Sequence, residues 1–335
     1  MAVNKSVNKA AKIFVAGHRG LIGSSLCRQL KELGYTSVLT AIRAELDLAD
    51  QTQVYDFIAK HKPDTVLVAA AKVGGILANS TYRVEFIAEN LQIQNNLILG
   101  AHRANVPRLV FLGSSCIYPR MAPQPMPEGA LLTGELEFTN RPYALAKIAG
   151  LELVASLRTQ YGRNYFSVMP TNLYGPGDNF HSENSHVLPG LMRRFWEAKR
   201  KKLPEVAIWG TGAAFREFLY VDDCAEGIIF LMENFEEKEL KERGLTQKGM
   251  YHVNLGSGME VTIRDLAQLI KKCVGYEGAI RFDTTKPDGT PRKLVDSSLL
   301  NAMGWKAHTD LATGIRKTFD WLQSEFAAHP DSLRL

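Results

Sequence analysis

Two short stretches of the chain carry side chains that could act together on a carbonyl compound. Ser114 follows an apolar run, residues 108–112, which predicts a buried strand. Tyr143 and Lys147 are four residues apart in a predicted helix, so their side chains share one face. A nearby ammonium would lower the tyrosine pKa from its ordinary value of about 10. The three residues predict proton transfer at a carbonyl carbon that also exchanges hydride with a cofactor.

A glycine-containing turn near the N-terminus predicts where that cofactor binds. Residues 12–16 predict a strand, and a helix to about residue 33 follows the turn. Because the glycines have no side chain, the backbone can approach a pyrophosphate, which the helix N-terminus then binds. The strand, turn and helix together indicate a dinucleotide site, whereas the Tyr143 and Lys147 spacing alone would be typical of any amphipathic helix. The predicted contacts in this turn are Gly17, His18, Arg19, Gly20, Leu21, Ile22 and Gly23.

The residues after the second predicted strand favour NADP(H) over NAD. That strand, residues 37–42, is followed by Arg43, where an acidic residue would bind the ribose of NAD. Arginine suits the 2′-phosphate of NADP, and Arg19 could lie on its other side, although both could also be ordinary surface residues. Asp47 could either reach the adenine amino group or cap the helix that follows it.

The order of predicted elements indicates an α/β protein with a Rossmann-type, doubly wound parallel sheet. Strands and helices alternate over residues 12–170, and the pattern loosens from residue 178. We expect a smaller α/β domain that binds the substrate. The predicted division places residues 1–178 and 215–256 in the NADP-binding domain, and residues 179–214 and 257–335 in the substrate domain. Residues 236–248 are expected to form a charged, solvated connection.

Composition excludes several classes of partner. The 335 residues carry a net charge of +5, which gives no specific indication of nucleic acid. The four cysteines are scattered, so neither a metal site nor a disulfide framework is expected. No apolar run reaches the roughly 20 residues that a membrane span requires. We therefore expect a cytoplasmic protein with no metal and no membrane partner.

The motifs in this order resemble the extended short-chain dehydrogenase/reductase family. The resemblance is strongest to members that act on GDP-4-keto-6-deoxy-D-mannose, and it covers residues 12 to about 325. It implies epimerisation at C3 and C5 and then NADPH-dependent reduction of the C4 ketone, giving GDP-L-fucose. It also implies a homodimer formed through two long helices, about residues 82–103 and 142–161. The stretches that carry the closer resemblance are residues 16–20, 70–76, 113–119, 169–176, 178–181, 184–187 and 286–293.

The resemblance also implies roles for individual side chains. The C4 ketone acidifies the protons at C3 and C5, so epimerisation needs a base on one face of the sugar and an acid on the other. Cys116 and His186 are similar to the family's base and acid, although spacing alone leaves their roles exchangeable. Ser114 and Tyr143 would hold the enolate oxygen, and Tyr143 would then protonate it during reduction.

Further residues match positions that the family uses for binding. Arginine suits a diphosphate and tryptophan forms a flat wall, whereas the alternative for residues 193–194 is a solvated helix face. The substrate contacts implied are Asn172, Arg194, Trp209, Arg216, Asp288 and, as a basic substrate-site residue, Lys293. The additional cofactor contacts implied are Leu48, Ala70, Lys147, Pro170, Thr171, Asn172, Leu173 and His186.

Three other functions are open to a chain of this kind. A nucleotide-sugar 4,6-dehydratase would carry an Asp-Glu pair where this chain has Ser115 and Cys116. A 4-epimerase prefers NAD, which Arg19 and Arg43 disfavour. A catalytically silent NADP-binding regulator usually loses the tyrosine or the lysine, and this chain has both Tyr143 and Lys147.

Overall fold

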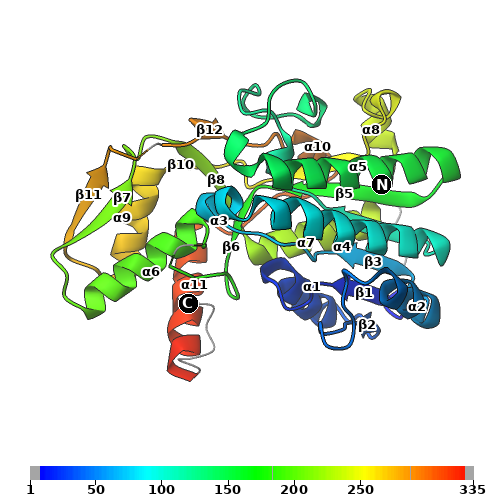
Figure 1. Cartoon of the computed structure of the whole chain (residues 1–335), viewed down its shortest axis with the longest axis horizontal. Helices are drawn as coiled ribbons and strands as arrows, with labels where there is room; N and C mark the ends of the chain where they lie inside the picture. The colour runs from blue at the N-terminus through cyan, green and yellow to red at the C-terminus, as the bar shows by residue number, and fades with distance from the viewer. Residues whose placement is uncertain (1–7, 183, 287, 329–335) are drawn as a thin grey trace.

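The computed structural model describes residues 8–182, 184–286 and 288–328, and its largest element is a six-stranded parallel sheet (Figure 1). The strands are nearly all apolar because helices cover both faces of the sheet. The sheet order reverses between β1 and β3, which lie side by side. In order across the sheet the strands are β2 (Val38–Leu39), β1 (Ile13–Ala16), β3 (Thr65–Val68), β4 (Arg108–Leu112), β5 (Asn164–Pro170) and β9 (His252–Leu255).

Alternate residues of each strand enter two separate cores. In β1, Ile13 and Val15 pack against the helices α1 (Leu21–Glu32) and α7 (Val221–Asn234). Phe14 and Ala16 point to the opposite face. That face is covered by α2 (Gln51–His61), α4 (Arg83–Arg103) and α5 (Arg141–Tyr161). The alternation has a period of two, as expected for strands buried on both faces. The predicted doubly wound sheet is therefore confirmed.

A smaller α/β unit lies beside this sheet (Figure 1). Its strands form a mixed sheet, in which β8 pairs with three neighbours, and a separate parallel pair. The strands are β6 (Asn172–Tyr174), β8 (Phe215–Tyr220), β10 (Glu260–Thr262) and β12 (Arg292–Lys293), and in the pair β7 (Glu205–Trp209) and β11 (Ala279–Asp283). The helices that pack against them are α6 (Val187–Arg200), α9 (Ile263–Val274) and α11 (Leu311–Ala328).

Short helices make up the rest of the regular structure. They are α3 (Ile76–Thr81), α8 (Lys238–Glu242), α10 (Ser298–Ala302), η1 (Ser115–Ile117), η2 (Glu128–Ala130), η3 (Phe138–Asn140) and η4 (Thr246–Lys248). Most side chains of residues 236–248 are exposed or partly exposed, as the charge pattern predicted, but Leu240 and Leu245 are buried. Two leucines were enough to anchor this segment on the core that contains α7. Among the described residues, no helix is both long enough and apolar enough to cross a bilayer.

The structure corrects one predicted detail at a helix start. Asp50, not Asp47, caps α2, because its carboxylate accepts a hydrogen bond from the Gln53 amide at 3.0 Å. Asp47 instead accepts a hydrogen bond from the Ala49 amide at 3.0 Å. The division into two domains at residue 257 stays a prediction, and the following segment is shared: Leu299 and Leu300 pack in the core of the large sheet.

Candidate active site

Ser114 and Tyr143 meet at the carboxyl end of the large sheet. Ser114 follows β4 and begins η1, and Tyr143 is in the first turn of α5. The two side chains are joined by a hydrogen bond. The turn from β4 into η1 therefore places the Ser114 hydroxyl against the phenol of Tyr143, which lies 29 residues later in the chain. The structure thus brings together two of the residues that the sequence predicted.

Lys147 is buried beneath this pair. Its Nζ donates a hydrogen bond to the Leu112 carbonyl at 2.7 Å and lies 4.7 Å from the centre of the Phe111 ring. The same atom is 5.8 Å from the centre of the Tyr143 ring. Burial lowers the pKa of Lys147 to about 7. One turn of helix separates the two residues, as the four-residue spacing predicted.

The predicted effect of Lys147 on Tyr143 is wrong for this structure. Burial raises the pKa of Tyr143 above its ordinary value, the nearby Cys116 raises it further, and only the hydrogen bond from Ser114 opposes this. Removing water from the phenolate raises the pKa of Tyr143 more than a neighbouring ammonium would lower it. In addition, the Lys147 ammonium is directed to the Leu112 carbonyl rather than to the phenol oxygen.

Cys116 lines a hollow at the edge of the same site. Its Sγ is 3.2 Å from Nδ2 of Asn140 and 3.4 Å from Nζ of Lys293. Asn140 immediately precedes α5, and Lys293 belongs to β12 in the smaller unit. The cysteine is therefore flanked by two nitrogen donors that come from distant parts of the chain.

His186 reaches this site because its segment rests on a glycine loop. The amide of Gly75 donates a hydrogen bond to the Asn184 carbonyl at 3.0 Å. A Cβ added to Gly75 would lie 2.3 Å from the carbonyl oxygen of Ser185, so only glycine permits this approach. His186 then begins α6. Burial lowers the pKa of His186, and the positive charge of Lys293 lowers it further.

The residues predicted to bind the GDP portion gather at one end of β7 and β8. Asp288 accepts hydrogen bonds from the Thr211 amide at 2.7 Å and the Thr211 hydroxyl at 2.8 Å, beside Trp209 and Gly210. Trp209 is 57% exposed, so its ring is available to a ligand. Arg216 is largely desolvated and lies near the Asp288 carboxylate.

Residues 193–194 do not form a solvated helix face. Arg193 pairs with Glu197 at 2.6 Å and donates to the Phe180 carbonyl at 3.0 Å. Arg194 donates to the Ala207 carbonyl at 3.1 Å, and burial lowers its pKa. The alternative of a solvated helix face is therefore wrong, because Arg194 packs against β7 and Arg193 binds the Phe180 carbonyl.

The glycine turn fits a dinucleotide pyrophosphate. Gly17 has φ of +91°, and a Cβ added there would lie 2.7 Å from the Ala70 backbone. A Cβ added to Gly23 would lie 2.1 Å from the Gly17 carbonyl oxygen. No side chain caps α1, and its first turn has no acidic residue, so its amides are available to an anion. The turn follows the carboxyl end of β1, where the strand order reverses. Ligands bind at this place in doubly wound sheets.

The remaining predicted cofactor contacts lie around this turn. The Arg43 side chain is 86% exposed and lies 3.7 Å from the Asp47 carboxylate. Ala70 follows β3 and contacts Gly17, and residues 170–173 lie at the end of β5 and the start of β6. The described residues contain no group of three or more His, Cys, Asp or Glu side chains that could hold a metal.

Comparison with known proteins assigns the chain to a family. The NAD dependent epimerase/dehydratase family matches residues 13–255. The chain belongs to this family. It is 54% identical to GDP-L-fucose synthase 1 of Arabidopsis thaliana over 95% of each chain, and 52% identical to GDP-L-fucose synthase of Escherichia coli over 92% of this chain and 96% of that one.

Solved structures of this epimerase/dehydratase type have the same fold. A GDP-6-OMe-4-keto-L-xylo-heptose reductase from C. jejuni is 35% identical, with a TM-score of 0.90 over 95% of this chain and 99% of that chain. A GDP-L-fucose synthetase from Naegleria fowleri bound to NADP is 26% identical, with a TM-score of 0.86 over 98% of each chain. These similarities show an α/β fold of the reductase and epimerase type along nearly the whole chain.

Three buried residues of this family member support the site but were missed in the sequence. Glu217 is fully buried and accepts hydrogen bonds from the amides of Gly258 at 2.8 Å and Val295 at 3.0 Å. Asn254 accepts a hydrogen bond from the Tyr118 hydroxyl at 2.5 Å, and its amide donates to Glu128 at 3.1 Å. The available signal was a polar residue inside an apolar strand, as at Glu217 in β8.

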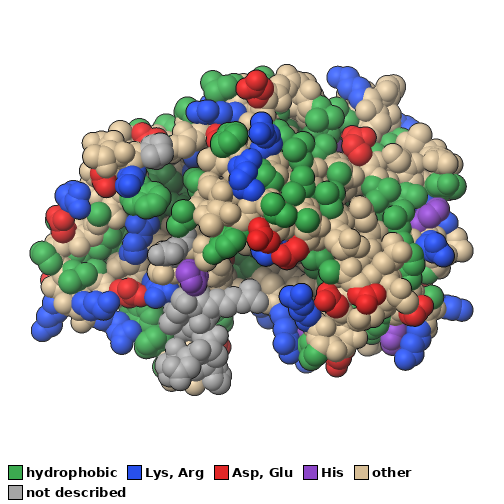
Figure 2. Space-filling view, viewed as in Figure 1, with side chains coloured by type: hydrophobic (Ala, Val, Ile, Leu, Met, Phe, Trp, Pro, Cys, Tyr) green, Lys and Arg blue, Asp and Glu red, His purple; other side chains and the backbone are tan. Residues whose placement is uncertain are grey.

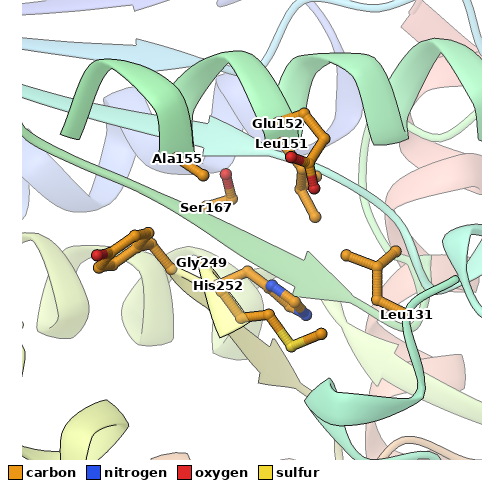
Figure 3. A pocket seen from close by; sticks show the side chains of 9 residues that line it. Leu131, Leu151, Glu152, Ala155, Ser167, Gly249 and His252 are labelled. Carbon is orange, nitrogen blue, oxygen red and sulfur yellow. The ribbon is translucent and has the colours of Figure 1, made fainter. Parts of the chain in front are cut away.

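A second, small hollow lies apart from these groups between α5, β5 and β9 (Figure 3). Leu131 and Leu151 line it together with Ser167 and His252. Burial lowers the pKa of His252 to about 4. Ser167 Oγ and His252 Nε2 have no hydrogen-bond partner among the described residues. None of the predicted catalytic side chains lines this cavity.

Proposed function

We propose that this chain converts GDP-4-keto-6-deoxy-D-mannose into GDP-L-fucose, with NADP(H) as its cofactor. The observation that carries the proposal is the 54% identity over 95% of both chains to a GDP-L-fucose synthase. The convergence of Ser114, Cys116, Tyr143 and Lys147 with His186 supports it, because epimerisation and reduction need these groups around one sugar.

Epimerisation is assigned to Cys116 and His186. One of them removes the proton from C3 or C5, and the other returns a proton on the opposite face. The hydroxyls of Ser114 and Tyr143 donate to the C4 oxygen while it carries the negative charge of the enolate. The hydrogen bond between these two hydroxyls keeps both oriented before the sugar arrives.

Reduction is assigned to Tyr143, which protonates the C4 oxygen. The nicotinamide supplies the hydride to C4 when the cofactor is bound. The raised pKa of Tyr143 keeps the phenol protonated, as a proton donor must be. Lys147 is desolvated beside it, and its position between Leu112 and the Tyr143 ring suits contact with both the cofactor and the phenol.

The nucleotide end of the substrate is assigned to the smaller unit. Arg194 and Arg216 supply charge for the diphosphate, and Trp209 supplies an exposed ring for the base. Asp288 orders the Thr211 turn beside Trp209. The protein has already displaced water from both arginines, so the bound diphosphate would give each guanidinium group an anionic partner.

We also propose that the chain forms a homodimer through α4 and α5. These two helices pack together on one side of the molecule, and Figure 2 shows hydrophobic side chains gathered over them. Val84 is 72% exposed and Leu145 is 44% exposed, and Leu145, Ala149 and Leu153 follow one another at helical spacing along α5. A second copy of the chain would cover this stripe.

The deciding experiment measures NADPH oxidation with GDP-4-keto-6-deoxy-D-mannose as the sole sugar, in buffered D₂O. We expect NADPH consumption, GDP-L-fucose as product and deuterium at C3 and C5. Reduction without deuterium would indicate a C4 reductase that does not epimerise. NADPH binding without consumption would leave the regulator interpretation instead.

A further inference from the structure

We propose that Asn140 binds a ring hydroxyl of the substrate hexose through its side-chain oxygen, Oδ1, and so helps to select the sugar that the site accepts. This contact is additional to those assigned above to Ser114, Tyr143 and the smaller unit. The identity of the sugar rests on the proposed function, whereas the position of Oδ1 is a property of the protein alone.

Asn140 occupies a position where an asparagine ordinarily caps a helix. It immediately precedes α5, and asparagine is preferred there because its side-chain oxygen can accept a hydrogen bond from an amide of the first turn. Asp50 caps α2 in this way, and Thr262 caps α9. Asn140 makes no such bond, so its oxygen is not used to stabilise α5.

The side chain of Asn140 is directed at Cys116 instead. Its Nδ2 donates a hydrogen bond to Sγ at 3.2 Å, which orients the amide group. Its Oδ1 is buried and has no hydrogen-bond partner among the described residues. A buried carbonyl oxygen without a donor costs free energy, so such an atom usually meets a ligand or an ordered water. Of the described residues that line the hollow beside Cys116, only Asn140 has a buried side-chain atom in this condition.

The position of Asn140 suits contact with the sugar ring. Thr290 and Lys293 line the same hollow, and Tyr143 follows three residues later in the chain. Cys116 is near enough to Tyr143 to raise the pKa of its phenol. The Asn140 amide therefore lies beside the group that donates to the C4 oxygen in the proposed function, where the neighbouring ring carbons would come within its reach.

The hexose has few groups that can donate to an amide oxygen. C4 is a ketone, C6 is a methyl group, and C1 carries the diphosphate. The O–H groups of the sugar are therefore those on C2 and C3, and both lie on the side of the ring next to C4 or one carbon further. We expect one of these two hydroxyls to donate to Oδ1, since a neutral hydroxyl and a neutral amide oxygen form an ordinary hydrogen bond.

The protein holds Asn140 in place before a sugar binds. Asn140 ends η3, which Glu137 caps by accepting a hydrogen bond from the Thr139 amide at 3.4 Å. The other carboxylate oxygen of Glu137 accepts from the Thr290 hydroxyl at 3.3 Å and pairs with Arg120 at 3.3 Å. These contacts tie η3 to the smaller unit. An acceptor that is already positioned loses little conformational entropy when the sugar binds.

The test compares the wild type with Asn140→Ala on three sugars. They are GDP-4-keto-6-deoxy-D-mannose and its two counterparts that lack the C2 or the C3 hydroxyl, and kcat/KM for NADPH oxidation is measured with each. The wild type should prefer the parent sugar over one of the deoxy sugars by roughly tenfold or more, because that sugar leaves Oδ1 without a donor. Asn140→Ala should reduce this preference to within about threefold and keep any preference against the other deoxy sugar. Loss of the contact with Sγ would slow all three sugars alike, so it cancels in the ratio.

Two further variants make the result specific. Asn140→Asp keeps an oxygen in the place of Oδ1 and should retain most of the preference for the parent sugar. Thr139→Val changes the same short helix by removing a hydroxyl that contacts Glu137, and it should also retain the preference. Asn140→Ala removes no helix cap, so we expect it to fold, and NADPH binding and circular dichroism check each variant.

Equal preferences in the wild type and Asn140→Ala for all three sugars would overturn the proposal. A preference that disappears in Thr139→Val as well would also overturn it, because the effect would then come from the shape of η3. Wild-type enzyme that oxidises no NADPH with any of the sugars would instead refute the proposed function.

Equilibrium binding tests the contact without turnover. GDP-6-deoxy-D-mannose keeps the C2 and C3 configuration of the substrate, and titration calorimetry measures its affinity. It should bind Asn140→Ala about tenfold more weakly than the wild type, and the counterpart that lacks the contacted hydroxyl should bind both proteins alike. Equal affinity of GDP-6-deoxy-D-mannose for both proteins would show that Asn140 does not bind the sugar.

Discussion

The cofactor turn and the epimerisation centre are built in different ways. The turn is one short segment, residues 16–23, and its shape depends on two glycines: a Cβ on Gly23 would meet the Gly17 carbonyl, and a Cβ on Gly17 would meet the Ala70 backbone. The epimerisation centre takes Cys116, Asn140, His186 and Lys293 from four segments, of which the last two belong to the smaller unit. Short-range backbone geometry determines the first region, whereas packing between distant segments determines the second.

This difference predicts how each region fails. A change in the turn should weaken cofactor binding. It should leave the catalytic side chains in place, because other segments of the chain position them. A change in the epimerisation centre should leave cofactor binding intact and remove one chemical step. The following substitutions test that separation.

Cys116→Ser should have the largest effect. A serine hydroxyl is far less acidic than a thiol, so it takes up and returns a proton of the sugar far less readily in this step. We expect deuterium exchange into C3 and C5 to fall by about a thousandfold, while NADPH binding is unchanged. Mass spectrometry of the recovered sugar measures the exchange. Cys273→Ser is the matched control, because Cys273 packs against the core of the smaller unit. Retained exchange in Cys116→Ser would show that Cys116 does not transfer these protons.

Tyr143→Phe should abolish reduction but leave part of the exchange. The variant lacks the proton donor for the C4 oxygen, although Ser114 can still donate one hydrogen bond to the enolate. We expect NADPH oxidation to fall by roughly a thousandfold and exchange by less. Stopped-flow absorbance of NADPH follows the first, and Tyr161→Phe at the exposed end of α5 is the control. Full NADPH oxidation in Tyr143→Phe would contradict the assignment.

Glu128→Gln should change the dependence of stability on pH. Burial raises the pKa of Glu128 to about 7, so between pH of about 4.5 and 7 the folded chain binds more protons than the unfolded chain. The free energy of unfolding of the wild type should therefore fall as pH rises through this window. The variant should lose the part of that fall that comes from Glu128, while Asp178, whose pKa burial also raises to about 7, contributes equally in both proteins. It should therefore be more stable at pH 8, by on the order of 2 kcal/mol.

Urea denaturation at pH 5 and pH 8 measures this difference. Glu135→Gln, in the same loop but exposed, should keep the wild-type dependence. Equal slopes in the wild type and Glu128→Gln would show that the carboxyl stays ionised in the folded chain. The result bears on the comparison because Glu128 holds Asn254, which binds the Tyr118 hydroxyl two residues after Cys116.

Gly23→Ala tests the turn. The new Cβ would collide with the Gly17 carbonyl, which has to move and thereby misaligns the amides at the start of α1. We expect NADPH affinity to fall by roughly tenfold or more, measured by quenching of tryptophan fluorescence. Gly129→Ala, where an added Cβ meets no atom within 4 Å, should bind normally. At saturating NADPH, deuterium exchange into C3 and C5 should be unchanged in both variants, and a loss of exchange would break the separation of the two regions.

Arg43→Asp should have the smallest effect, because the Arg43 side chain is 86% exposed and its interaction with a phosphate is screened by solvent. We expect the ratio of kcat/KM for NADPH to that for NADH to fall by about tenfold, from loss of the 2′-phosphate partner. Rates with each cofactor, at equal ionic strength, give the ratio. If the ratio does not change, Arg19 or another residue reads the phosphate instead.

The sequence was sufficient for features that depend on neighbouring residues. The doubly wound sheet follows from apolar strands that alternate with helices, and the pairing of Tyr143 with Lys147 follows from helical spacing. The motif at residues 70–76 could be matched to the family, but its physical reason became visible only when Gly75 was found against Ser185. The predicted lowering of the Tyr143 pKa failed for a related reason, since burial of a side chain cannot be read from its neighbours in the sequence.

The sequence by itself determined the doubly wound sheet, the nucleotide turn and the identity of the chemical groups, because periodicity, glycine spacing and residue type act over short distances. Only the tertiary structure decided which of those groups touch. It placed Lys293 against Cys116, 177 positions earlier in the chain. It also buried Glu217, which binds the Val295 amide, and Asn254, which binds the Tyr118 hydroxyl. The physical reason is that charge, desolvation and hydrogen bonding depend on distance in space, which the fold sets.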